Sequence, residues 1–360
     1  MATEAYVIKG LDQLRLLRAR EEALQRARQQ GEIVTCPSIS LDFARQLTEH
    51  AHVDELALLL EWIAAMMDGR GLDNVHIFDL RFNHLGASGV AALCPILVRL
   101  QNVKRLDLRA NDMTPSGAAA LVDLVKYPPT DEGRTAPLLT FLHQLEHLDF
   151  SDNGLGPIGM ASLAPVLKTL TNLTCLRLGA NSFGTEVMGQ GVSQRITPKF
   201  EASKDVMVPL FWCLSELKSL DLQANDLSTI WLSHQGQCCN LGLESIVLCR
   251  NELHSLPPEI PRMAGLKHLD VSFNQISLLP PEVGLLTCLQ YLDLRHNQLQ
   301  ALPVNRLLPL TRLSSLSCLG NPDLLCPPSE VSSRGGAAVM EFLRGPCSAR
   351  VCLCPRPERR

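Results

Sequence analysis

The sequence predicts an α/β solenoid whose short parallel strands stack into one sheet, and two observations carry this prediction. The first is a repeat in the stretch LKHLDVSFNQISLLPPEVGLLTCLQYLDLRHNQL (266–299). Its key residues recur after 23 positions: Leu266, Leu269, Val271, Asn274 and Ile276 return as Leu289, Leu292, Leu294, Asn297 and Leu299. The second is composition, because 46% of the chain is hydrophobic but only 4% is aromatic, so aliphatic residues must supply the core.

The spacing of this repeat has a physical reason. The first, fourth and sixth positions place apolar side chains on one face of a short strand, where they fill a core. The asparagine at the ninth position turns inward, where its amide can pair with backbone groups left free as the strand ends. No single unit can bury its own apolar edge, so neighbouring units must stack. The pattern LxxLxLxxNxL resembles the leucine-rich repeat family, and this resemblance implies a horseshoe with a parallel, concave β-sheet.

Asparagines at the ninth position define about nine repeats within residues 71–326. This structural ladder comprises Asn83, Asn111, Asn153, Asn181, Asn225, Asn251, Asn274, Asn297 and Asn321. The intervals between them are 28, 42, 28, 44, 26, 23, 23 and 24 residues, so the early units are longer than the late ones.

Residues 1–70 precede the first clear repeat, and we expect them to form a helical N-terminal cap. The segment 11–30 is rich in helix-forming residues with leucines on one face, and 40–67 forms a second helical region. Such helices cover the apolar edge that the first repeat would otherwise expose. The alternative for 11–30 is a short coiled coil or a partner-binding helix.

The early repeats predict helices on the outer face. Gly89, Gly117 and Gly159 each lie six residues after their asparagine, and apolar residues follow ten and fourteen residues after it. This four-residue rhythm is typical of an amphipathic helix. Residues 71–183 are similar to the ribonuclease-inhibitor type of leucine-rich repeat, which implies strand–helix units.

The late repeats carry a different outer segment, LHSLPPEIPRMAGL (253–266) and ISLLPPEVGLLTCL (276–289). Because Pro-Pro cannot lie inside a helix, this return path is expected to be extended or a single turn. Residues 241–325 resemble the short intracellular class found in Ras-associated scaffold proteins. In 327–360 we expect a capping helix at 333–344, with Val339, Phe342 and Leu343 on its apolar face, and then a flexible tail.

Two insertions lengthen the repeats, near 127–141 and 184–212. Both fall between an outer-face segment and the next strand, so we expect them to emerge from the same edge of the solenoid. Insertions on one side of a repeat protein often mark its binding side. The alternative is neutral drift, because long surface loops are thermodynamically cheap.

The motifs of common enzyme classes are absent from the sequence. It contains no GxSxG, no P-loop and no HExxH, so we predict no enzyme, no catalytic residue and no cofactor. The cysteines at 326, 347, 352 and 354 match no familiar zinc spacing, so no metal site is predicted. A net charge of −4 gives no electrostatic case for nucleic acid or a membrane surface. With no secretory signal visible, we expect a cytoplasmic protein with reduced thiols.

The exposed side of the strands carries the candidate binding residues. Fifth positions form a ladder that is mostly acidic: Asp79, Asp107, Asp149, Arg177, Asp221, Val247, Asp270 and Asp293. This ladder either recognises a partner of opposite charge or reflects the consensus sequence of such repeats, in which aspartate is common at this position and pairs with a nearby arginine. Its interruptions and the nearby aromatic residues are then the informative positions. The candidate partner-binding residues are Arg81, Phe82, Arg109, Arg177, Val247, Phe273, Tyr291 and Arg295.

These observations predict a non-enzymatic, intracellular protein-interaction module or scaffold that binds a folded partner on its concave face. Three alternatives remain open. The early repeats resemble GTPase-activating proteins for Ran, which makes a small GTPase a candidate partner, although no functional loop of that family is matched. The arginine-rich segment 11–30 suggests a structural role in a ciliary or cytoskeletal assembly. Substrate recognition for a ubiquitin ligase would require a recruitment motif such as an F-box, which the first 70 residues do not show.

Overall fold

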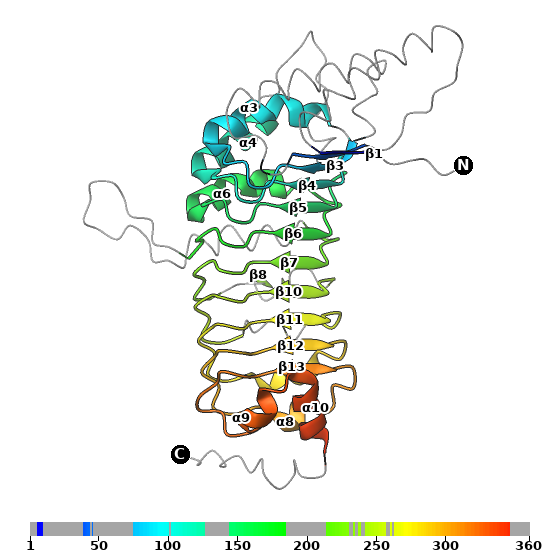
Figure 1. Cartoon of the computed structure of the whole chain (residues 1–360), viewed down its shortest axis with the longest axis vertical. Helices are drawn as coiled ribbons and strands as arrows, with labels where there is room; N and C mark the ends of the chain where they lie inside the picture. The colour runs from blue at the N-terminus through cyan, green and yellow to red at the C-terminus, as the bar shows by residue number, and fades with distance from the viewer. Residues whose placement is uncertain are drawn as a thin grey trace, which may run out of the picture. The chain divides into compact units, whose positions relative to one another are not determined.

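The structure is a computed structural model (Figure 1) that describes residues 6–9, 39–43, 45, 75–100, 102–126, 144–184, 214–229, 233–234, 237–238, 242–256, 260 and 263–345. The chain divides into two compact units, Met1–Asn181 and Ser182–Arg360. Each unit is a stack of repeats with its own strands, and each is described by itself below.

The strands of the first unit pair in parallel and in chain order. They are β1 (Tyr6–Lys9), β2 (Ile39–Asp42), β3 (Val75–Asp79), β4 (Arg105–Asp107), β5 (His147–Asp149) and β6 (Cys175–Arg177). The register places like positions of successive repeats side by side. Asp79 therefore lies opposite Asp107, Asp107 opposite Asp149, and Asp149 opposite Arg177.

The second unit repeats this arrangement. Its parallel strands are β7 (Ser219–Asp221), β10 (Ser245–Val247), β11 (His268–Asp270), β12 (Tyr291–Asp293) and β13 (Ser315–Ser317). Between β7 and β10 lies a short antiparallel pair, β8 (Ser233–His234) and β9 (Gln237–Cys238), which the sequence did not predict. All nine strands predicted from the asparagine pattern are present, and the fold is an α/β leucine-rich repeat solenoid.

The N-terminal region differs from its prediction, because residues 40–42 of the expected helical region belong to strand β2. The reason is that Leu41 pairs with Phe78, and Phe43 donates its N–H to the Asp79 carbonyl. Leu80 of the next repeat donates to the Asp107 carbonyl in the same way. The register aligns Gln46 with Asn83, so this repeat lacks the asparagine that marks the others. The segments 11–30 and 46–70 lie outside the described residues.

The outer segments follow the predicted change along the chain. In the first unit they are the helices α3 (Gly86–Arg99), α4 (Thr114–Lys126) and α6 (Gly156–Leu167), which lie beside the strands in Figure 1. In the second unit the described return segments shrink to a 3-10 turn η3 (Pro281–Leu285) and a single helical turn α8 (Val304–Leu307). Proline at the start of η3 accounts for the change, since it cannot continue a helix from the preceding turn.

The core consists of the apolar positions of the repeat. Leu266, Leu269 and Val271 are 0% exposed, as are their counterparts Leu292 and Leu294. The ninth-position asparagines are buried beside them, and most of them donate Nδ2–H to a carbonyl oxygen of the preceding repeat. Asn181, for example, donates Nδ2–H to the carbonyl oxygens of Leu178 and Phe150, at 3.0 Å each. The asparagines thus pair the backbone groups that the turn would leave unsatisfied inside the stack.

The C-terminal cap contains two helices, α9 (Ser329–Ser332) and α10 (Gly336–Arg344), where the sequence predicted one helix from 333 to 344. Gly335, with φ of 98°, separates them. Val339, Met340 and Leu343 are the buried apolar residues of α10, whereas Phe342 is half-buried, so Met340 takes the place predicted for Phe342. The insertions near 127–141 and 184–212 fall almost entirely outside the described residues, as does the tail from 346.

Candidate interaction surface

The side chains that do not pack in the core lie on the exposed face of the strands and in the turns that follow. We call the third, fifth and seventh positions of each repeat the sheet face, and the eighth positions the turn column. In β12, for example, these are Tyr291, Asp293, Arg295 and His296. Because the strands are parallel and in register, each position forms a row that crosses successive repeats at roughly 4.8 Å intervals.

The aspartates of the sheet face have a structural task. Each accepts a hydrogen bond on Oδ1 from the backbone N–H two residues later, as Asp149 does from Ser151 at 2.9 Å and Asp270 from Ser272 at 2.9 Å. The same bond occurs at Asp79, Asp107, Asp221 and Asp293. The flanking N–H groups bond to the next repeat, so this N–H faces away from the neighbouring strand, where a side-chain acceptor can satisfy it. The acidic ladder therefore follows from folding.

Two arginines at seventh positions are held by these aspartates. Arg295 donates from Nε to both carboxylate oxygens of Asp293, at 3.0 and 2.9 Å, and its second terminal nitrogen lies 2.7 Å from Oδ2. The hydrogen bond raises the pKa of Arg295. Arg81 contacts Asp79 at 2.8 Å in the same way. Their side chains are nevertheless 45% and 39% exposed, so each presents a fixed guanidinium to solvent.

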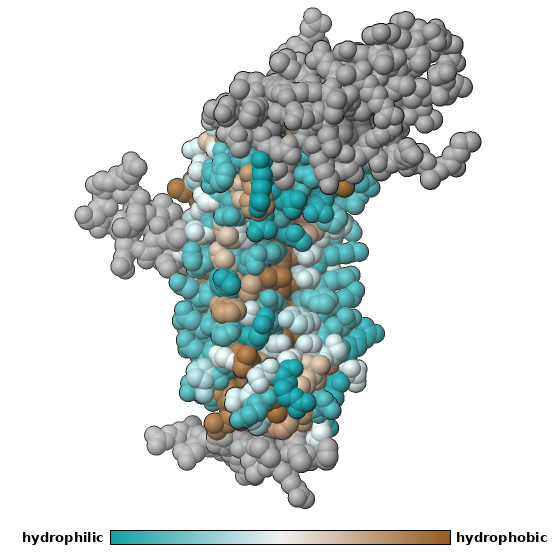
Figure 2. All heavy atoms as spheres, viewed as in Figure 1, coloured by the Kyte–Doolittle hydropathy of each residue, from teal (hydrophilic) through white to brown (hydrophobic). Residues whose placement is uncertain are grey.

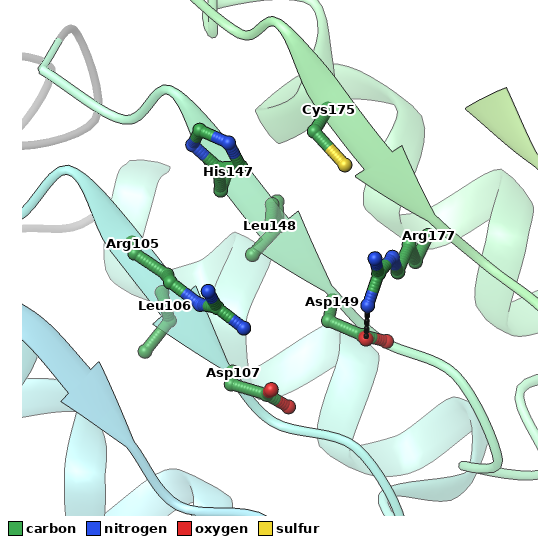
Figure 3. Close-up of a pocket in the computed structure, with 8 residues that line it drawn as sticks. All are labelled: Arg105, Leu106, Asp107, His147, Leu148, Asp149, Cys175 and Arg177. Carbon is green, nitrogen blue, oxygen red and sulfur yellow. Dashed lines mark ion pairs between the residues drawn. The ribbon is translucent and has the colours of Figure 1, made fainter. Parts of the chain in front are cut away.

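Strands β4, β5 and β6 form a shallow hollow on the sheet face (Figure 3). Arg105, Asp107, Asp149 and Arg177 lie over it, and Arg177 points to Asp149 with 3.7 Å between nitrogen and oxygen. Burial raises the pKa of Asp107 to about 6, and the nearby carboxylate of Asp149 acts in the same direction. The hollow encloses about 40 Å³, whereas pockets for small molecules enclose roughly 300–1,000 Å³. It can seat part of a side chain but not a substrate.

Tyr291 belongs to the same face in the second unit. Its hydroxyl donates to Asp293 Oδ2 at 2.9 Å, and its ring centroid lies 6.2 Å from that of His268 on the preceding strand. Burial raises the pKa of Tyr291 to about 12, and the bond to Asp293 contributes to this shift. The phenol is therefore a fixed donor that stays neutral at ordinary pH.

The turn column has unusual backbone geometry. The eighth residue of the described repeats adopts positive φ, and four such positions hold small residues: Ala110, Ala180, Ala224 and Gly320. Phe82 and Phe273 adopt φ of 60° and 54° with a large side chain. The left-handed region costs about 1–2 kcal/mol for a residue with a Cβ, and Phe273 regains little by burial because it is 42% exposed. The described repeats share this geometry at the eighth position with residues of every size, so it is a property of the turn.

Cations flank both phenylalanines. The guanidinium carbon of Arg45 lies 4.8 Å from the centre of the Phe82 ring, and that of Arg109 lies 5.5 Å from it. Phe273 stacks on His296 with ring centroids 4.3 Å apart. Arg250, from the repeat before, lies 5.3 Å from the same ring centre.

The predicted candidates thus fall into separate groups. In the first unit Arg81, Phe82 and Arg109 lie close together, and Arg177 pairs with Asp149. In the second unit Tyr291 and Arg295 share Asp293.

Phe273 donates its N–H to the carbonyl of Arg295 in the next repeat. Val247 is half-buried in β10.

The sequence did not predict Arg45, Arg250 and His296 as candidates, because the prediction considered only the fifth and seventh positions and nearby aromatic residues. The alignment of eighth positions 250, 273 and 296, each one residue before its asparagine, was the available signal.

The described residues hold no group of three or more histidine, cysteine or acidic side chains that could bind a metal ion. Their cysteines include five free thiols: Cys94, Cys175, Cys249, Cys288 and Cys318. Cys326 is disulfide-bonded, so the expectation of reduced thiols is wrong for that residue. None of the described helices has the length and apolar character needed to cross a membrane.

Comparison with known families agrees with the geometry. The family model described as Leucine rich repeat matches residues 242–299, and a second model of the same description matches 74–94, 99–122 and 142–164. The chain is a leucine-rich repeat protein. Both matched regions coincide with the strands and outer segments described above, one group in each unit.

The comparison with individual proteins gives weaker likenesses. No curated protein sequence is matched. A leucine-rich repeat protein of Leptospira interrogans is similar at 24% identity over 69% of this chain, with a TM-score of 0.33. The structure titled TLR13–ssRNA13 complex is similar at 19% identity over 69% of this chain, with a TM-score of 0.40. This leucine-rich repeat chain spans 66% of the first of those structures and 36% of the second.

Proposed function

We propose that this protein is a non-enzymatic interaction module that binds a folded protein partner on its sheet face. Leucine-rich repeat proteins generally bind other proteins.

The observation that carries the proposal is the fixed, exposed arginines. Arg295 and Arg81 each hold their guanidinium against an aspartate of their own strand, yet 45% and 39% of the side chain faces solvent. A partner that contacts such a group loses little side-chain freedom, because folding has already ordered it. Tyr291, fixed by the same Asp293, supplies an aromatic group of the type enriched in binding hot spots.

The surface composition is consistent with a protein partner. In Figure 2, hydrophilic residues cover most of the visible coloured surface, and hydrophobic residues form smaller groups among them. Mixed surfaces of this kind are typical of non-obligate protein interfaces, which are no more apolar than the remaining surface. Electrostatic complementarity then contributes specificity and the rate of association.

Crosslinking with mass spectrometry of the full chain in native cells tests this proposal. The test variant exchanges Arg81, Arg109 and Arg295 for Gln. The matched control exchanges three exposed arginines outside the sheet face for Gln: Arg306, Arg312 and Arg334. We expect a partner that crosslinks to the sheet face of wild type and control but is lost from the test variant. If the same partner persists in a folded test variant, the sheet face is not its binding site.

A further inference from the structure

Three residues of the turn column, an arginine, a phenylalanine and a histidine, form a continuous stack in the second unit. We propose that Arg250, Phe273 and His296 form a docking site for an acidic segment of the protein partner. This inference rests on the proposed binding function and names the chemistry of the partner. The three residues define what we call the turn stack.

The turn stack follows from the repeat geometry. The parallel strands β10, β11 and β12 run in register (Figure 1), so the residues that follow them meet along one edge of this unit. Arg250, Phe273 and His296 hold the eighth positions of consecutive repeats, with φ of 57°, 54° and 53°. The Phe273 ring therefore has Arg250 on the side of the preceding repeat and His296 on the side of the following one.

The last repeat leaves room for this arrangement. Its eighth residue is Gly320, and a Cβ at that position would lie 2.6 Å from Nδ1 of His296. Any side chain there would displace the imidazole from the stack. Glycine thus allows His296 to rest against the backbone of the final turn while its ring stacks on Phe273.

The positive charge of the turn stack is not neutralised within the described part of the chain. None of the ion pairs among those residues involves Arg250, and its side chain is exposed. The nearest acidic row is already engaged. Asp293 bonds Arg295 and Tyr291, and Asp270 accepts from both the N–H and the hydroxyl of Ser272, at 2.9 and 2.7 Å. A partner can therefore supply the missing anions.

The ring in the centre favours the same charge. Because its faces are turned toward Arg250 and His296, Phe273 presents its edge to solvent, and the edge of an aromatic ring carries positive partial charge. The outer two groups are two repeats apart, roughly 10 Å at the spacing of parallel strands. In a segment with polyproline II conformation, acidic side chains three residues apart lie on the same side and span a similar distance, at about 3.1 Å per residue. The expected ligand is such a segment.

Single-stranded nucleic acid is the competing ligand, because it also combines negative charge with stacking. One observation favours an acidic peptide instead. The faces of Phe273 turn toward its two neighbours, so the ring offers no free platform for a base.

Fluorescence anisotropy on the full chain tests the inference. The probe is a labelled Glu/Gly peptide with Glu at every third position, compared with its Gln analogue and with polyuridylate. The variants are Arg250→Gln, Phe273→Ala and His296→Gln. The control is Arg312→Gln, because Arg312 is also exposed but precedes β13, at the opposite end of the strands. Circular dichroism verifies that each variant is folded.

We expect wild type and the control to bind the Glu peptide and not the Gln analogue. Arg250→Gln and Phe273→Ala should each bind roughly tenfold more weakly, the size of one charge-assisted contact. Three results would overturn the inference: no binding of the Glu peptide by wild type, unchanged binding by the folded variants, or preference for polyuridylate. If the partner of the sheet face survives while these variants have no effect, the inference fails and the proposed function stands.

Discussion

Replacing Asn153 with alanine tests how the asparagine ladder stabilises the repeats. Asn153 is 1% exposed, and its Oδ1 accepts the N–H groups of Asn111 and Met113 at 3.1 and 3.3 Å. Its Nδ2 donates to the carbonyls of Leu108 and Phe150, at 2.9 Å each, and to that of Ser151 at 3.2 Å. The substitution removes all five interactions, but they do not count equally.

The three carbonyls keep another donor. Leu108 still receives Nδ2–H of Asn111 at 3.0 Å, Phe150 receives that of Asn181 at 3.0 Å, and Ser151 receives the N–H of Ala110. The two N–H groups lose their side-chain acceptor. A buried donor without a partner costs about 1–3 kcal/mol, so the expected loss in the free energy of unfolding is about 4 kcal/mol. That is a large share of the roughly 5–15 kcal/mol typical of a domain.

Urea unfolding monitored by circular dichroism measures this loss. Asn305→Ala is the control, because Asn305 is exposed in α8 and should change the free energy by no more than about 0.5 kcal/mol. Hydrogen exchange gives the local assignment. The amides of Asn111 and Met113 should lose protection, whereas that of Leu108, bonded to the Asp149 carbonyl at 2.9 Å, should lose less. A loss below about 1 kcal/mol, or equal deprotection of all three amides, would refute the reasoning.

Three further predictions concern buried groups. Burial raises the pKa of Asp107 to about 6, above about 3.9 in the unfolded chain, so the folded state binds the proton more tightly and this group's contribution to stability falls as the pH rises from about 4 to about 7. Asp107→Asn should flatten the dependence of the urea midpoint on pH, and identical slopes would contradict this. Gly336→Ala should loosen the C-terminal cap, because its Cβ would collide with Ser315 Oγ and lie 2.9 Å from the Leu316 nitrogen; limited proteolysis should then release α10, unlike in Ala337→Ser. At about pH 7 iodoacetamide should modify Cys288 well before Cys249, since burial raises the pKa of the Cys249 thiol to about 12 and the thiolate is the reactive form; equal rates, measured by mass spectrometry, would count against it.

The periodic part of the fold could be predicted from the sequence because two features mark the buried residues of each repeat. These features are the regularly spaced apolar positions and the asparagine at the ninth position. Leu269 and Asn274 belong to the same unit, and both are buried as the spacing requires. The outer helices of the early repeats and the proline-limited turns of the late ones were predictable for the same local reason. Stacking then follows, because no unit can bury its edge alone.

The first strands could not be predicted in this way. Residues 40–42 were predicted as the start of a helical region, since Gln46 occupies the sequence position where other repeats have asparagine. Tertiary pairing with β3 decides that conformation. The turn stack was missed for a different reason. Positive φ at the eighth position points its side chains along the repeat edge, and that contact depends on register between repeats more than on any one repeat's sequence.

The hydrogen bond that each aspartate accepts from the N–H two residues later divides the positions of the sheet face into two kinds. In six strands the aspartate contributes to folding, so replacing it should cost stability. In β6, β10 and β13 the fifth residue is Arg177, Val247 or Ser317, and folding makes no such demand there. Mutation can change these three sites at little cost to stability. When a related protein acquires a new partner, we therefore expect the first substitutions on the sheet face to occur at these three positions.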